Sequence, residues 1–290
     1  MEIEWNQWAE DDPLSRPRID KRGIAMILTG HIRPLGREYK NPVAYRLRLD
    51  DQEVSLNDFL GNTIEISYLG IISCIYCGRK IKKSYNGGSC FPCFRDRAEN
   101  DLCIVKPHLC HFHQGTCRDE SFGQSHCMQP HIVYLALSDD IKVGISRKSN
   151  SLNRWIDQGA VAAVPIAEVP DRKTAGELEF HLSQFIKDKT NWRRMLKNQI
   201  ADKDIEAVRA EVWEKIPKDY EPYVVSSHEV LQFQYPQLHI PEKIRSLDLN
   251  KQPHIKDNLI GIKGQYMIFE KGVINMRKFS GYKVQVVLGA

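Results

Sequence analysis

Two cysteine pairs constrain this chain more than any other feature of its sequence. Cys74-Ile-Tyr-Cys77 and Cys90-Phe-Pro-Cys93 each place two thiols two residues apart, and twelve residues separate the pairs. Two such turns can close a tetrahedral shell of four thiolates around one zinc ion. Gly78 follows the first pair, and Gly87 and Gly88 precede the second, where tight turns need backbone conformations that glycine allows. The spacing therefore predicts a structural zinc site with these ligands: Cys74, Cys77, Cys90 and Cys93.

Disulfide bonds are the alternative use of the same cysteines. Met1 to Glu10 is acidic and has no apolar run, so nothing at the start of the sequence resembles a secretory signal. In a reducing cytosol, cysteines spaced in this way are metal ligands far more often than bridges. We therefore expect a cytoplasmic zinc protein. We expect no membrane partner, because no apolar stretch approaches the ~20 residues that span a bilayer.

Four further cysteines follow within one short stretch. Their spacing is too wide for a second paired motif, but they are near enough in sequence to share an ion: Cys103, Cys110, Cys117 and Cys127. Five histidines are interleaved with them: His108, His111, His113, His126 and His131. A shell of four thiolates and a shell of three thiolates with one histidine both remain open. We predict a second zinc site here, with buried free thiols or an iron-sulfur centre as the alternatives.

The length and charge of the chain limit the remaining possibilities. With 290 residues it exceeds the usual size of one domain, so we expect an α+β protein of several modules. The net charge of +4 permits nucleic-acid binding without requiring it. No nucleotide cofactor is expected, because no phosphate-binding loop or dinucleotide fingerprint occurs. The predicted modules are an N-terminal β unit (1–70), a Cys/His-rich zinc module (71–130), a central α/β domain (131–200), a helical connector (201–258) and a C-terminal β segment (259–290).

Short alternations of apolar and polar residues predict strands towards both ends of the chain. Examples are Tyr45–Leu49 and Ile64–Tyr68 in the first part, and Tyr266–Phe269 and Tyr282–Val286 in the last part. We expect antiparallel pairing within each group. Because the two groups have the same character, we also expect them to pair with each other in one barrel-like domain.

The centre of the chain predicts a β-hairpin and two helices. Ile132–Ala136 and Ile141–Ile145 are rich in strand-forming residues. A helix is expected from Ser151 to Gly159, and a second helix begins at Thr174, where Thr174 and Glu177 match a capping box. The expected order is therefore strand, strand, helix, loop or strand, helix.

These central residues resemble the GIY-YIG nuclease superfamily, in which two signature strands precede an arginine on the next helix and a glutamate on a later one. Tyr134 corresponds to the first signature, Lys142-Val143-Gly144 corresponds to the second, and Arg154 lies at the matching offset. Two glutamates could supply the acid. We prefer Glu179, because Glu177 already has a local explanation as the capping-box partner, whereas Glu179 lies beside the apolar stripe of its helix.

The resemblance implies a phosphodiester hydrolase with four catalytic residues. Tyr134 would activate or orient a water molecule, Arg154 would donate to the scissile phosphate, and Glu179 would hold one Mg²⁺ or Mn²⁺ ion. Lys142 stands where the second signature has a tyrosine. A lysine there could lower the pKa of Tyr134 or contact phosphate, or it could mark a domain that binds nucleic acid without cutting it.

A closer resemblance covers most of the chain. The hairpin motifs and five further segments are similar to those of a prokaryotic family described only as domain of unknown function 2797: Cys74–Lys80, Gly115–Arg118, Arg154–Ala160, Thr190–Arg193 and Gly261–Tyr266. That family has no established activity. The expectation of a nuclease therefore rests on the GIY-YIG likeness of the central module alone.

Basic residues near these motifs favour DNA or RNA as the partner. Arg147 and Lys148 follow the second signature strand, and Arg193 and Arg194 lie beside Trp192. Cations contact phosphates, and an aromatic ring can stack on an unpaired base. The opposing interpretation takes these cations as ordinary solvated side chains and Trp192 as part of the core.

Two functions remain open for the whole chain. The first is a metal-dependent endonuclease, and the second is a zinc-stabilised binding protein that uses the central domain as a scaffold. A docking platform for another protein is a weaker third.

Overall fold

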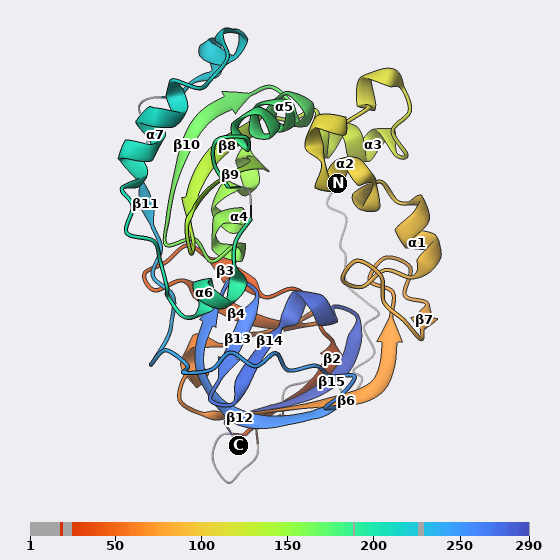
Figure 1. The fold of residues 1–290 in the computed structure, drawn as a ribbon. Helices are drawn as coiled ribbons and strands as arrows, with labels where there is room; N and C mark the ends of the chain where they lie inside the picture. The colour runs from red at the N-terminus through yellow and green to blue at the C-terminus, as the bar shows by residue number, and fades with distance from the viewer. Residues whose placement is uncertain (1–17, 20–24, 188, 226–228, 290) are drawn as a thin grey trace, which may run out of the picture.

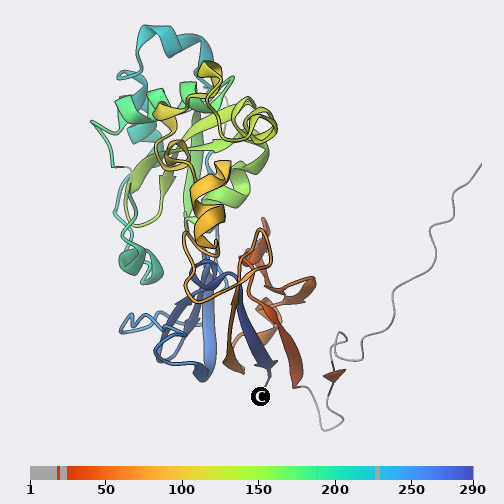
Figure 2. The same cartoon turned by 90° about the vertical axis from the view of Figure 1, so that its right-hand side faces the viewer.

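The computed structural model describes residues 18–19, 25–187, 189–225 and 229–289. They form two lobes that the Cys/His-rich segment joins along one side (Figure 1, Figure 2). The lower lobe in Figure 1 holds strands from both ends of the chain, and the upper lobe holds the central strands. Met1 to Glu10, which suggested that no secretory signal is present, lies outside the described residues. No helix within the described ranges has the length and apolar character needed to cross a membrane.

One sheet of the lower lobe combines N-terminal with C-terminal strands. Its order is β1-β2-β15-β6-β12-β13-β14, and β7 also pairs with β6. The strands are β1 (Arg18–Ile19), β2 (Met26–His31), β6 (Thr63–Ser73), β7 (Lys80–Ile81), β12 (His254–Lys263), β13 (Tyr266–Phe269), β14 (Gly272–Asn275) and β15 (Tyr282–Leu288). β15 lies between β2 and β6 and is antiparallel to both, with Val286 opposite Leu28 and Ile66. The expected pairing of the two terminal groups is confirmed.

The expected barrel is wrong, since the described strands form an open sheet that ends at β1 on one side and β14 on the other. Closure would need the outer edge of β14. That edge is covered instead by a neighbouring loop, because the Val273 N–H donates to the Arg245 carbonyl and the Leu247 N–H donates to the Val273 carbonyl, both at 2.8 Å. An edge whose backbone groups are already paired has no ladder left to offer another strand.

A three-stranded sheet completes the lower lobe. It consists of β3 (Gly36–Glu38), β4 (Ala44–Leu49) and β5 (Gln52–Ser55), in that order. β4 and β5 are joined by a tight turn in which Asp50 has a φ of +49°. Apolar side chains from both sheets, among them Leu47 and Ile66, share one buried core.

The upper lobe is built on an antiparallel sheet of order β11-β10-β8-β9. Its strands are β8 (His131–Leu137), β9 (Ile141–Arg147), β10 (Ala162–Val169) and β11 (Leu231–Gln232). The helices are α4 (Ser151–Asp157), α5 (Arg172–Leu182), α6 (Trp192–Leu196) and α7 (Ile205–Trp213). The expected order of strand, strand, helix, loop or strand, helix is confirmed, and the element left open is the strand β10. Along β8, Ile132 and Tyr134 join the core that includes α4 and the lower lobe, whereas Val133 and Leu135 join a second core with α5 and α7.

Helix α5 begins earlier than expected. Its N-cap is Asp171, whose carboxylate accepts hydrogen bonds at 2.9 Å from both the backbone N–H and the hydroxyl of Thr174. Aspartate is the stronger cap, and its charge also suits the positive end of the helix dipole. Thr174 and Glu177 therefore form no capping box. Glu177 instead lies 3.7 Å from the Lys173 ammonium and accepts a hydrogen bond from the Tyr220 hydroxyl at 3.4 Å.

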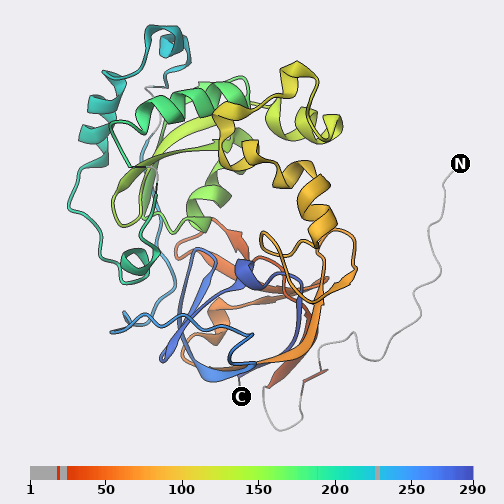
Figure 3. The same cartoon turned by 45° about the vertical axis from the view of Figure 1, so that its right-hand side comes forward.

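The Cys/His-rich segment is a series of short helices along the side of the molecule (Figure 3). They are α1 (Phe91–Asp96), α2 (Leu102–Val105), the 3₁₀ turn η3 (Pro107–Leu109) and α3 (Glu120–Phe122). The turn η3 packs directly on α5 at Gly176. A Cβ atom on Gly176 would lie 2.4 Å from the backbone nitrogen of His108 and 2.5 Å from the Cβ atom of Pro107. Only a glycine on α5 allows this close approach.

A carboxylate at the end of α4 joins the two lobes. Asp157 lies 2.8 Å from the Arg37 guanidinium and 2.6 Å from that of Arg277, and it accepts a hydrogen bond from the Gln265 amide at 2.7 Å. All three partners belong to the lower lobe. The contacts fix α4, and with it the other residues that α4 carries.

Candidate functional site

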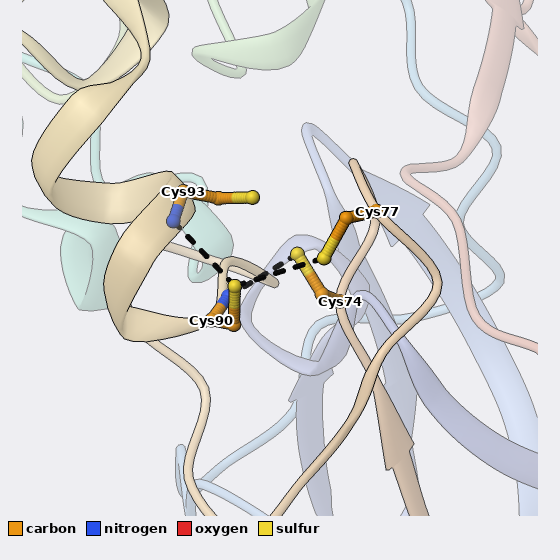
Figure 4. A group of neighbouring side chains, drawn as sticks. All are labelled: Cys74, Cys77, Cys90 and Cys93. Atoms are coloured by element: carbon orange, nitrogen blue, oxygen red, sulfur yellow. Dashed lines mark hydrogen bonds between the residues drawn. The ribbon is translucent and has the colours of Figure 1, made fainter.

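The four cysteines of the paired motifs meet at one point (Figure 4). Cys74 directly follows β6, and Cys90 is the N-cap of α1, so a strand end and a helix start supply the two pairs. Gly78 closes the first turn with a φ of +69°, and its N–H donates to the Cys74 carbonyl at 2.9 Å. The four sulfur atoms all lie within 4.8 Å of one another.

The separations of these sulfur atoms fit a zinc ion. Four Zn–S bonds of about 2.3 Å in a tetrahedron put the sulfurs about 3.8 Å apart, and those of Cys77 and Cys90 are 3.7 Å apart. The backbone N–H groups of Cys90 and Cys93 donate to the sulfurs of Cys74 and Cys90 at 3.2 and 3.5 Å. Burial raises the pKa of Cys74, but backbone N–H donors outweigh burial and bring that pKa down to about 6. No disulfide joins any of the eight cysteines. The cluster is therefore compatible with structural zinc.

A cleft of about 340 Å³ lies beside β9, the outer strand of the upper sheet, and three of the four predicted catalytic residues line it. Lys142 comes from β9, Arg154 from α4 and Glu179 from α5. Glu179 is the one carboxylate among the lining residues. The Cys/His-rich segment supplies a further wall: Ile104, Val105, Pro107, Phe122, His126 and Cys127.

Tyr134, the fourth predicted catalytic residue, lies behind β9 and is fully buried. It is paired with Gly144 in the hairpin, and its ring occupies the space that a side chain at Gly144 would fill; a Cβ atom there would be 2.8 Å from the Tyr134 hydroxyl. That hydroxyl donates at 3.0 Å to the Oε1 atom of Gln158, which lines the cleft. Trp155 packs edge-on against the ring, with 5.5 Å between centroids. Tyr134 thus supports α4 residues that face the cleft.

The pKa of Tyr134 is shifted upwards overall, which is opposite to the direction expected from a neighbouring lysine. Burial is the largest effect and raises the pKa. The Arg154 guanidinium lowers it in part, and the Glu179 carboxylate raises it further. The shift favours the protonated hydroxyl, which donates its hydrogen bond to Gln158.

Sequence reasoning missed two cleft residues, Gln158 and Arg172. Arg172 is the first residue of α5 and donates to the Ile104 carbonyl at 2.8 Å, which links α5 to α2. Its Nε atom is buried and has no hydrogen-bond partner in the described part of the chain. A cation in the first turn of a helix opposes the helix dipole, and that signal could have drawn attention to Arg172. Gln158 carries no comparable signal.

The four predicted nucleic-acid contacts fall into two separate groups. Arg147 lines the cleft, and Lys148 beside it pairs with Glu168 at 2.8 Å on the surface. Arg193 and Arg194 are on α6 and do not line the cleft. Arg193 lies over the ring of the half-buried Trp192, with 4.2 Å to the centroid. Trp192 in turn stacks on Tyr266 of the lower lobe.

The remaining four cysteines surround a void of about 10 Å³: Cys103, Cys110, Cys117 and Cys127. Three of them are buried together, and Phe112, Phe122 and Met128 pack around these three. Their sulfurs do not form a set as tight as the first cluster. Within 4.8 Å of one another lie instead the ligand atoms of Asp101, Cys103 and His111.

A family model described as a protein of unknown function, DUF2797, matches residues 61–284. The chain belongs to this family. The DUF2797 match includes β6, both cysteine clusters, the upper lobe and most of the C-terminal strands, and it leaves out β2 to β5. No curated protein and no solved structure matches the chain significantly. The expected resemblance to DUF2797 is confirmed, and the family brings no activity with it.

Proposed function

We propose that this DUF2797 protein hydrolyses phosphodiester bonds of DNA or RNA in the cleft beside β9. The observation that carries the proposal is that Lys142, Arg154 and Glu179, which are far apart in sequence, line the same cleft. Arg147 and Arg172 line it as well. A cleft with several cations and one carboxylate suits a phosphodiester and one divalent metal ion. The GIY-YIG likeness, which assigns catalytic roles to the same positions, supports this function.

The side chains divide the work of phosphoryl transfer between them. Arg154 and Arg172 donate to the non-bridging phosphate oxygens, where the planar guanidinium group matches the oxygen geometry and offsets the charge of the transition state. Lys142 adds a second type of cation at the β9 side of the cleft. The Tyr134 hydroxyl donates a hydrogen bond to the side-chain oxygen Oε1 of Gln158. The side-chain NH₂ group of Gln158 is then left to donate to the substrate or to the attacking water.

Glu179 fits the role of ligand for Mg²⁺ or Mn²⁺. These ions are commonly held at phosphate sites by one or two carboxylates, with water and substrate oxygens completing the shell. Glu179 is the one carboxylate among the lining residues, so the cleft provides that minimum. When bound, the ion would stabilise charge on the leaving oxygen. The zinc at the first cysteine cluster has a structural role in this proposal.

The experiment is a cleavage assay on single-stranded, duplex and branched DNA and RNA with Mg²⁺ or Mn²⁺. Wild-type protein should cut at least one of these substrates, and Glu179→Gln and Arg154→Ala should each slow the reaction about 100-fold or more. Glu177→Gln is the matched control, because Glu177 is an exposed acid on the same helix that does not line the cleft. Equal losses in the Glu177 and Glu179 variants would contradict a site-specific role.

Binding without cleavage is the second candidate function. The raised pKa of Tyr134 favours this function, because a protonated tyrosine does not act as a base. Position 142 has a lysine in place of the second signature's tyrosine, so it supplies no tyrosinate either. In this case wild-type protein shifts a labelled nucleic acid in a gel but cuts none of the panel. Hydrolysis is supported instead if Glu179→Gln abolishes cutting and retains the gel shift.

A further inference from the structure

We propose that Cys103, Cys110, Cys117 and Cys127 hold a second zinc ion, and that this ion fixes the wall of the cleft beside β9. The inference concerns metal content and structure, so it stands whether or not the cleft hydrolyses nucleic acid.

The four thiols share a void that suits one ion. Its volume of about 10 Å³ corresponds to roughly one water-sized sphere, so a single ion fits and a larger ligand does not. The cysteines reach it from different turns of the segment. Cys103 lies on α2, Cys110 follows η3, Cys117 precedes α3, and Cys127 ends the turn after α3.

The burial pattern around the void favours a metal ion. Cys103, Cys110 and Cys127 are 3–7% exposed, whereas Leu102 and Val105 on the same helix as Cys103 are 57% and 78% exposed. On this helix the cysteine therefore faces inwards and the larger apolar side chains face outwards. Small segments with little apolar burial are usually held together by disulfides or metal. The cysteines form no disulfide, which favours metal.

A mixed ligand set of Asp101, Cys103 and His111 is the competing arrangement, since these ligand atoms are within 4.8 Å of one another. The Asp101 carboxylate is already in use. It caps α2 by accepting from the Cys103 N–H and lies 2.7 Å from the Arg118 guanidinium, which a metal cation would have to displace. His111 contacts the Thr116 hydroxyl through Nδ1 at 2.7 Å, and its Nε2 atom lies 3.7 Å from the Asp101 carboxylate. The thiol set supplies four ligands instead of three. The hydrogen bond that the Cys117 thiol donates to the Asp119 carbonyl at 3.2 Å is lost when the thiol gives up its proton to bind zinc.

Arg172 lies beside the same thiols. Its Nε atom is buried and has no hydrogen-bond partner in the described part of the chain, and its charge interacts with Cys127, Cys103 and Cys110 as well as with Glu179. Zinc with four thiolates carries a net charge of about −2, which a nearby guanidinium offsets. The second zinc site therefore gives this partly buried cation a counter-charge on the side of the cysteines.

The position of this ion explains how it would act on the cleft. On one side it restrains η3, which packs on Gly176 of α5. On the other side it restrains Phe122, His126 and Cys127, which line the same cleft as Glu179. Loss of the ion would loosen that wall and leave β9 and α4 in place.

The decisive measurement is the number of zinc ions per chain in the full-length protein, determined by inductively coupled plasma mass spectrometry. We expect two zinc ions per chain, one in Cys103→Ser/Cys127→Ser and one in Cys74→Ser/Cys93→Ser. In the first double variant, hydrogen exchange should rise in 104–110 and 122–127 more than in β9. One zinc ion in the wild type, unchanged by the Cys103→Ser/Cys127→Ser substitutions, would overturn the proposal.

Wild-type protein alone gives a second test, which does not depend on the variants folding. X-ray absorption at the zinc edge should fit sulfur at about 2.3 Å with no nitrogen shell near 2.0–2.1 Å. A nitrogen shell that disappears in His111→Ala would identify histidine as a ligand and refute the four-thiolate set. Retention of both zinc ions in His111→Ala, with loss of one in Cys117→Ser, would support it.

Discussion

Asp157→Ala is expected to destabilise the protein strongly, because one carboxylate holds three partners from the other lobe. The side chain of Asp157 is 5% exposed, and that of Arg37, 2.8 Å away, is 18% exposed. Gln265, which donates to Asp157 at 2.7 Å, is also buried. Alanine would leave a buried guanidinium and a buried amide facing an empty space.

The size of the effect follows from the exposure of each partner. Removing one member of a buried ion pair costs about 3–5 kcal/mol. Arg277 is 44% exposed and regains water, so its share is small. Gln265 keeps a hydrogen bond to the Leu35 carbonyl at 3.3 Å. We therefore expect a loss of about 3 kcal/mol in the free energy of unfolding for Asp157→Ala, and about 1–2 kcal/mol for Asp157→Asn, which keeps an acceptor oxygen.

Chemical denaturation at a fixed zinc concentration measures this loss, since a zinc ion bound at the cysteines would itself stabilise the folded state. Glu53→Ala is the matched control. Glu53 also contacts two guanidinium groups, those of Arg46 and Arg48 at 3.1 and 2.7 Å, but its side chain is 41% exposed. The control should cost less than about 1 kcal/mol. If Asp157→Ala costs no more than Glu53→Ala, the lobes are not joined through this carboxylate and the reasoning fails.

Three further predictions concern the hairpin, a charged turn and the zinc. Gly144→Ala should lose about 1–3 kcal/mol of stability, because the new Cβ atom would lie 2.8 Å from the Tyr134 hydroxyl. In a double-mutant cycle, Tyr134→Phe should restore part of that loss. If the stability losses of the two single variants simply add in the double variant, the contact is contradicted. Burial raises the pKa of Asp140, but hydrogen bonds from Lys187 and Lys203 at 2.8 and 2.7 Å bring this pKa down to about 2. The ionised carboxylate therefore stabilises the fold at every pH above its unfolded pKa of about 3.9. This stabilisation is lost as the pH falls to about 2. Asp140→Asn should thus be less stable than wild type by about 1–2 kcal/mol at neutral pH, and the gap should close below pH of about 4; a gap independent of pH would show that the ion pairs are not its origin. Chelation of zinc should lower the melting temperature, with recovery on adding Zn²⁺ and none on adding Mg²⁺, and a melting curve that the chelator leaves unchanged would argue against structural zinc.

Local chemistry in the sequence predicted the strands and the first cysteine cluster. Alternation in Tyr282–Val286 indicates a strand with one buried face, and the strand is present in β15. The two Cys-x-x-Cys turns carry their own geometry, so their convergence needed no information from the rest of the chain. Such features depend on neighbours in sequence, and they are therefore readable from it.

Features that depend on distant contacts were only partly predicted. The similar character of the terminal strands indicated that the two groups pair, but nothing in the pattern of β15 specifies that β2 and β6 are its partners, or that the Arg245–Leu247 loop covers the edge of β14. At the start of α5, Asp171 and Thr174 are both good caps, and the sequence alone does not decide that the Asp171 carboxylate accepts the hydrogen bond from the Thr174 N–H. Arg172 and Gln158 join the cleft through packing of α2 and Tyr134, which no local motif encodes.

The location of β15 between β2 and β6 has a consequence for the order in which the protein assembles during synthesis. The ribosome makes β2 and β6 early, but the strand that joins them comes at residues 282–288. The β8–β9 hairpin pairs over a short loop and can form as soon as it emerges, whereas pairing across more than 200 residues must wait until β15 has been made. Until then β6 carries unpaired backbone groups on the side that β15 will occupy. The lower lobe is therefore the last to close, and its early strands are where a nascent chain is most exposed to aggregation or to chaperones.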